Sequence, residues 1–163
     1  MLSVFVAPKR YWAMAAPWVL AAFITPAQAG LYNQTNLVSD ISGLATITDP
    51  QLINPWGFSH SATSPFWISN QGMNSSTLYA VTGPTTVTKT VINAPSGFVG
   101  IPTIPGGPNG PTGQVSNGNT SSFVLANNQN ARFIFADLNG TISAWNGGAS
   151  STIKATVPNT VFT

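Results

Sequence analysis

Residues 55–79 read PWGFSHSATSPFWISNQGMNSSTLY, and residues 111–135 read PTGQVSNGNTSSFVLANNQNARFIF. Each stretch opens on Pro-x-Gly, passes a polar turn into an apolar run, and passes a second polar turn into another. The anchors Pro55 and Pro111 are 56 positions apart, and Phe66 and Phe123 are 57 apart. The two stretches therefore read as copies of one unit, with the order strand, turn, stronger strand, turn, strand.

Such a unit, with three or four antiparallel strands, cannot bury both of its faces alone. Radial stacking of such sheets in a β-propeller solves this problem. Within each unit, Pro fixes φ where the first strand begins, and Gly permits close backbone approach where first strands crowd together. We therefore expect an all-β chain that forms a partial β-propeller of about two blades after an N-terminal signal helix. The alternative fold is a β-sandwich.

Short β-rich runs recur between turn residues after the leader, and no helical period persists. Two turns contain residues that tolerate positive φ, at Asn70-Gln71-Gly72 and at Asn139-Gly140, and the second is a hairpin signal. The expected strands are residues 35–38, 57–59, 66–69, 77–81, 86–92, 113–116, 122–126, 132–136, 141–145 and 152–157.

The first 29 residues have the pattern of a secretory signal peptide. Lys9 and Arg10 precede an apolar run over 11–24, Pro26 interrupts it, and Ala27-Gln28-Ala29 is a small-x-small cleavage triplet. We expect cleavage before Gly30, a secreted, periplasmic or extracellular location, and no membrane span in the mature chain. The alternative is an uncleaved anchor over 11–29, which approaches the roughly 20 residues of a bilayer span.

Charge and cysteine content exclude some functions. Without Lys9 and Arg10, three basic residues balance three acidic ones. A neutral chain is not suited to nucleic acid, which is bound through clustered Lys and Arg. The chain has no cysteine, so it has neither a disulfide framework nor a lipid-bearing Cys after the leader.

These observations predict four parts. Residues 1–29 are the signal peptide, and 30–54 are a lead-in strand and turn. Residues 55–110 are the first repeat with a Gly/Pro-rich loop, and 111–163 are the second repeat with the start of a truncated third.

Three blocks, at residues 36–40, 48–57 and 64–69, resemble a family of uncharacterised exported bacterial proteins of the β-propeller type. Residues 135–145 are similar to the same family's second blade. The family is in turn loosely similar to six-bladed NHL and lactonase-like propellers. The resemblance implies a propeller fold and an exported address without an established activity. Members look longer than this chain, so the resemblance implies an N-terminal fragment.

Few residues have side chains suited to catalysis or metal binding. His60 is the only histidine, and without Cys or Glu it has no partner for a nucleophilic or metal constellation. Asp40, Asp49 and Asp137 are potential calcium ligands, helped by Asn54 or Asn70. Lactonase-like propellers hold their metal with a Glu in addition to Asn and Asp, which this sequence lacks. We interpret the three Asp residues as turn, hairpin and strand-end residues, and we predict no catalytic, cofactor-binding or metal residue and no cofactor.

Aromatic residues allow two interpretations. Trp56, Trp67 and Trp145 form either a carbohydrate-stacking platform or, as we favour, part of the packing between blades. In an incomplete propeller the outer faces of the two sheets lack a neighbour. We expect those faces to carry large apolar side chains, namely Phe66, Ile68, Leu78, Val124 and Ile134.

The sequence leaves two hypotheses for function. The first is an exported binding or scaffold module that recognises an unknown ligand, a glycan or a surface component through its loops. The alternative is a lactonase-like propeller hydrolase whose catalytic and metal residues lie in missing C-terminal blades. We favour the first.

Overall fold

The computed structural model describes residues 33–92, 96–106 and 108–157. The predicted leader, its cleavage site and the predicted start of a third repeat beyond residue 157 lie outside these residues. The described part is all-β, as expected, with eleven strands and one short 3₁₀ helix. Among its helical segments, none has the length and apolarity that crossing a bilayer demands.

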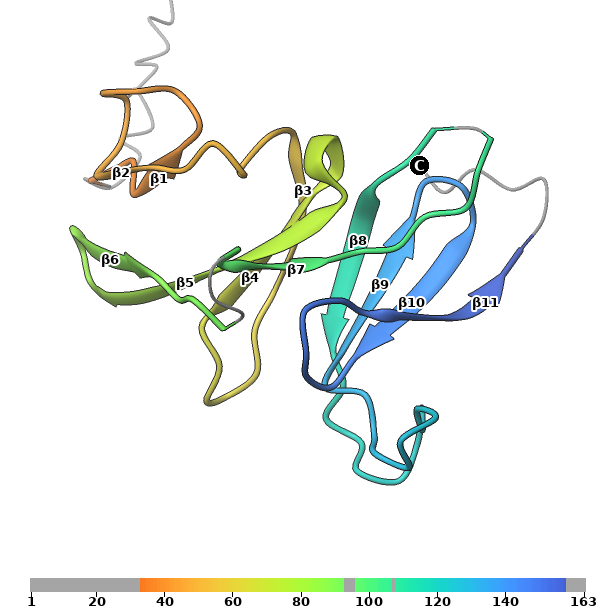
Figure 1. Ribbon diagram of the computed structural model, residues 1–163. Coiled ribbons are helices and arrows are strands. Elements are labelled where there is room, and N and C mark those ends of the chain that lie inside the picture. The colour runs from red at the N-terminus through yellow and green to blue at the C-terminus, as the bar shows by residue number, and fades with distance from the viewer. Residues whose placement is uncertain (1–32, 93–95, 107, 158–163) are drawn as a thin grey trace, which may run out of the picture. The chain divides into compact units, whose positions relative to one another are not determined.

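The first sheet follows the chain in order (Figure 1). Its antiparallel strands are β3 (Pro55–Ser59), β4 (Phe66–Asn70), β5 (Ser75–Gly83) and β6 (Thr86–Lys89), and β7 (Phe98–Gly100) adds a second pairing to β5. The corner between β4 and β5 is a 3₁₀ helix, Gln71–Met73. The turn predicted at Asn70-Gln71-Gly72 is present, and its left-handed residue is Asn74, with φ 47°.

The second sheet is also an antiparallel meander. It contains β8 (Pro111–Ser116), β9 (Phe133–Asp137), β10 (Thr141–Trp145) and β11 (Thr152–Thr156). The predicted hairpin at Asn139-Gly140 is confirmed. Gly140 has φ 83°, and its N–H donates to the Asp137 carbonyl at 3.0 Å. The loop has three residues, 138–140, and the glycine at its left-handed position is typical of three-residue hairpin loops.

A lead-in segment precedes the first sheet. It contains a short parallel pair, β1 (Val38–Ser39) and β2 (Ile47–Thr48). The strand predicted at 35–38 overlaps β1 only at Val38, and β2 was not predicted. Two-residue strands carry too little alternation to be recognised in a sequence.

The first strands of the two sheets have the same local geometry. β3 and β8 both begin with Pro-x-Gly, and in both the pairing register shifts between that Pro and that Gly. The corners that face these strands also match. The Gln71 N–H donates to the Asn54 carbonyl at 3.1 Å, and the Leu138 N–H donates to the Gly110 carbonyl at 3.0 Å. Asn54 and Gly110 stand directly before the two prolines, and both have positive φ.

The second anchor of the predicted repeat was wrong. Residues 122–126 do not form a strand of the sheet, and Val124 contributes only an isolated bridge to Asn130. Phe123 has φ 58° and packs with Leu125 in a small cluster on Ala144. This apolar run therefore covers the second sheet instead of pairing within it. By register, Ile68 and Phe135 are counterparts, because they pair with Phe58 and Gln114, and the counterpart of Phe66 is therefore Phe133.

The two sheets pack face to face through aromatic side chains. Trp67 from β4 stacks on Phe133 with ring centroids 4.0 Å apart, and its ring lies 4.9 Å from that of Trp145. Burial of such rings dominates the stabilisation of a core this size. The main cluster of buried apolar residues consists of Trp67, Leu78, Val99, Ile101, Phe133, Phe135 and Trp145.

The first strands of the two sheets approach closely beside this core. A Cβ on Gly57 would lie 3.0 Å from the Thr112 carbonyl oxygen, so a side chain at this position would press against β8. The predicted role of the Pro-x-Gly glycine is therefore confirmed at Gly57. The Gln114 side chain bridges the sheets by donating to the carbonyls of Gly57, at 3.1 Å, and of Trp67.

Candidate functional site

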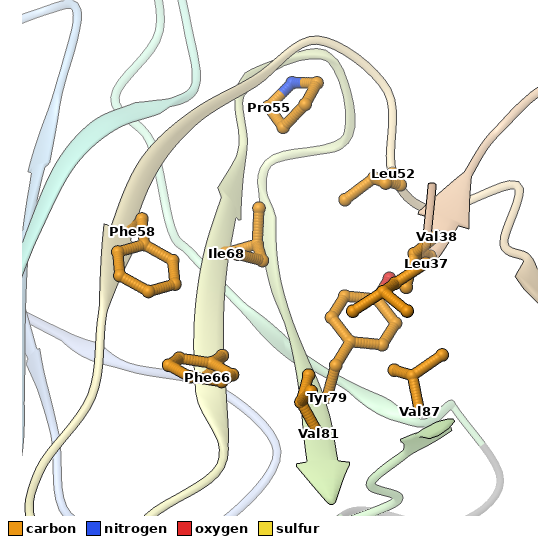
Figure 2. Close-up of a pocket in the computed structure, with 10 residues that line it drawn as sticks. All are labelled: Leu37, Val38, Leu52, Pro55, Phe58, Phe66, Ile68, Tyr79, Val81 and Val87. Carbon is orange, nitrogen blue, oxygen red and sulfur yellow. The ribbon is translucent and has the colours of Figure 1, made fainter. Parts of the chain in front are cut away.

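A strongly apolar surface depression lies on the first sheet. It has a volume of about 430 Å³, and we call it the sheet-1 groove. Figure 2 shows its side chains, which come from β3 to β6 and from the lead-in segment. They are Leu37, Val38, Leu52, Pro55, Phe58, Phe66, Ile68, Tyr79, Val81 and Val87.

Strand register explains why these side chains share one face. Phe58 pairs with Ile68, and Phe66 pairs with Tyr79, and directly paired residues of antiparallel strands project to the same side. Trp67 lies between Phe66 and Ile68 and therefore points to the opposite side, into the core. Phe58 remains 59% exposed even though it stacks on Phe66, with centroids 5.1 Å apart.

The lead-in segment is attached to this face by a buried polar cluster. Asp49 is 2% exposed, and its carboxylate accepts a hydrogen bond from the Tyr79 hydroxyl at 2.6 Å. The same carboxylate pairs with the Lys89 ammonium at 2.8 Å. The cluster joins β5, β6 and the turn after β2, so it positions one wall of the groove against the sheet.

The protonation states of the cluster follow from its contacts. Burial alone would raise the pKa of Asp49, but hydrogen bonds from Lys89, Tyr79 and the Gln51 N–H together hold it below its usual value. Burial and the hydrogen bond to Asp49 raise the pKa of Tyr79. The hydroxyl therefore stays protonated as a donor, and the cluster acts as a fixed ion pair at neutral pH.

The second sheet carries a counterpart of the groove. By register, Phe133, Phe135 and Trp145 occupy the positions of Phe66, Ile68 and Tyr79. In the second sheet this face is buried, because the Trp67 face of the first sheet covers it. The sheet-1 groove is thus the same face of the repeat without a covering sheet.

The prediction of apolar outer faces is confirmed in part. Phe66 and Ile68 line the groove as expected. Ile134 lies on the outer side of the second sheet and is partly covered by the cluster around Leu125. Leu78 was predicted wrongly, since it pairs with Trp67 and is buried in the core. The groove itself was missed in the sequence because Phe58, Tyr79 and the lead-in residues lie far apart along the chain.

The predicted site residues are not brought together. Among the described residues, no group of three His, Cys, Asp or Glu side chains is placed to hold a metal ion. Asp40 is exposed, and Asp49 belongs to the ion pair. Asp137 is buried at its hairpin, where it accepts from the N–H groups of Gly110 and Asn139. Burial raises the pKa of Asp137, although these two N–H donors oppose the shift.

The two predicted amide helpers, Asn54 and Asn70, have structural partners. The Asn54 side chain donates to Gln71 Oε1 at 2.7 Å. The Asn70 side chain donates to Thr77 at 3.0 Å and to Ser75 at 3.3 Å. Both amides therefore stabilise the corner between β4 and β5.

His60 and the tryptophans take separate places. His60 is exposed after β3, where its ring meets Phe66 edge-on at 5.2 Å and its Nδ1 lies 3.0 Å from the Ser61 carbonyl. Trp67 and Trp145 are in the core, as favoured, whereas Trp56 is 56% exposed. The expectation of core packing fails for Trp56, which is the unpaired residue of the bulge between Pro55 and Gly57.

Comparison with known proteins gives no match, either to a family model, to a curated protein or to a solved structure.

Proposed function

We propose that this chain is an exported protein of the β-propeller type that acts as a binding or scaffold module, and that the sheet-1 groove is its binding surface. One observation carries the proposal. The groove has the same register positions as a face that the second sheet buries against a neighbouring sheet.

Repetition supports the propeller part of the proposal. Each sheet begins with a bulged Pro-x-Gly strand, continues as a four-stranded meander, and turns at a matched corner. Sheets that stack face to face with their first strands side by side are the structural unit of a propeller. The predicted leader supports the exported address.

The chemistry of the groove supports binding through apolar contact. Its open half presents Phe58, Phe66 and Val81, and the carboxylate nearest to it is already paired with Lys89. Removal of such an apolar surface from water is favourable. Contiguous apolar patches typically mark interaction sites.

An apolar fluorescent probe, anilinonaphthalene sulfonate, tests the proposal. We expect the probe to bind the purified chain at low protein concentration and Phe58→Ser to reduce the signal several-fold. The matched control is Ile41→Ser, because Ile41 is 60% exposed like Phe58 but lies outside the groove. Both substitutions are at exposed sites, so the fold should tolerate them. Equal probe binding by Phe58→Ser and the wild type would contradict the proposal.

A further inference from the structure

We propose that the occupant of the sheet-1 groove is a second copy of this chain, which enters with the outer face of its own second sheet. The inference rests on the proposed function and adds the partner. It makes the association head-to-tail, because two different faces of the chain meet.

The chain already contains one example of this contact. The Trp67 face of the first sheet covers the Phe133 and Phe135 face of the second. The groove repeats the covered side, with Phe66 and Ile68 at the positions of Phe133 and Phe135. A sheet with a face like that of Trp67 is therefore the shape that fits the groove.

The second sheet offers that face on its outer side. By register, Val115, Ile134, Ala136 and Ile142 are the counterparts of Ser59, Trp67, Ser69 and Ser76. Three serines of the inner contact are thus replaced by apolar residues. Val115 is 54% exposed on the edge strand β8, although a loop cluster covers part of Ile134. The loop cluster around Leu125 covers Ala144, the counterpart of Leu78. The part of the outer face beside this cluster, where apolar residues replace serines, is suited to burial against a partner.

The groove is matched to this face in polarity. At the position where the second sheet has the polar bridge Gln114, the groove has Phe58. Gln114 donates to backbone carbonyls of the first sheet, whereas Phe58 has no such capacity and favours an apolar partner. Val115 of a second copy supplies such a side chain. After the leader, the chain has a net charge of about zero, so electrostatic repulsion between two copies is weak.

Sedimentation velocity over a range of protein concentrations tests this assignment. We expect the purified full chain to associate, and we expect Phe58→Ser and Val115→Ser each to weaken association at least about tenfold, as loss of a large apolar contact does. Ile41→Ser is the matched control and should associate like the wild type.

Mixing the two weakened variants gives the decisive measurement. In the mixture, the intact outer face of Phe58→Ser meets the intact groove of Val115→Ser. Head-to-tail association therefore predicts a species of two copies that neither variant forms alone at the same concentration. A milder variant, Gly113→Ala, should weaken association without destabilising the monomer, because Gly113 is the counterpart of the tightly packed Gly57.

Three results would overturn the inference. The first is a wild-type chain that stays monomeric over the whole concentration range. The second is association that Phe58→Ser weakens and Val115→Ser does not, since that pattern means groove-to-groove pairing. The third is a mixture that behaves as the sum of its two components. If probe binding still depends on Phe58 in any of these cases, the proposed function stands and only the partner is wrong.

Discussion

Two glycines at the same repeat position should respond oppositely to an added methyl group. Gly57 and Gly113 both follow the bulged proline by two residues, in β3 and β8. A Cβ on Gly57 would lie 3.0 Å from the Thr112 carbonyl oxygen and 3.0 Å from Ser69 Oγ. A Cβ on Gly113 would meet only the Ala136 Cβ, at an ordinary 3.6 Å. The difference arises because the second sheet covers Gly57.

The magnitudes follow from these contacts. Ser69 can rotate away, but Thr112 contributes a backbone oxygen, and β8 can retreat only by loosening the stack of Trp67 on its neighbours. Overpacking of this kind costs roughly 1–3 kcal/mol. Gly113→Ala removes freedom from the unfolded chain and stabilises by roughly 0.4–1 kcal/mol where the backbone permits it. The two variants should therefore differ by roughly 1.4–4 kcal/mol in the free energy of unfolding, or roughly 4–15 °C in Tm.

Urea and thermal unfolding at the lowest workable protein concentration measure this difference. The low concentration separates monomer stability from association. Equal destabilisation by both substitutions, or greater destabilisation by Gly113→Ala, would refute the argument that the sheets pack against each other at Gly57.

Two further predictions concern the lead-in segment and the leader. Because folding lowers the pKa of Asp49, its carboxylate stabilises the fold above the unfolded pKa of about 4 and this stabilisation is lost as pH falls through the folded pKa. Asp49→Asn should therefore cost roughly 3 kcal/mol in urea unfolding at neutral pH and much less once the pH lies below the folded pKa of Asp49, and a cost that does not change with pH would argue against the ion pair. N-terminal sequencing of exported protein should start at Gly30, whereas a start at Met1 in the membrane fraction means an anchor.

Most strands of the two large sheets were predicted from the sequence, because the local sequence signals agree with the tertiary structure in those strands. At β9 and β10, β-rich runs flank Asn139-Gly140, and the turn residues alone specify a hairpin. At β3 and β8, the Pro-x-Gly pattern marks a bulge that both sheets contain. These features depend on neighbours in the chain, so a single sequence is sufficient to find them.

The failures occur where long-range packing decides the structure. Residues 122–126 have the composition of a strand. In the structure, Phe123 and Leu125 instead pack over Ala144 and do not pair with a neighbouring strand of the sheet. The strand β7 consists of three residues and includes a glycine, so only its pairing with β5 distinguishes it. The groove was missed for the same reason, because only strand register brings Phe58 and Tyr79 to one face, although 20 residues separate them in the sequence.

The residues at one equivalent position have different roles in the two sheets. Trp145 and Tyr79 are counterparts, and each has one polar group to satisfy. The Trp145 indole donates to the Gly148 carbonyl at 2.9 Å within its own hairpin, so the ring is free to pack against the other sheet. The Tyr79 hydroxyl instead donates to Asp49, and this bond attaches the lead-in to the sheet.

Attachment at Tyr79 divides the exposed face of the first sheet. The Tyr79 end is closed by a carboxylate that Lys89 neutralises, and it contributes to folding instead of to contact with a partner. The Phe58 end has no such cover, and its ring is exposed beside Phe66. The proposed partner therefore meets the groove at the Phe58 end. An edge strand that presents an apolar residue, as β8 does with Val115, satisfies this requirement without displacing the lead-in.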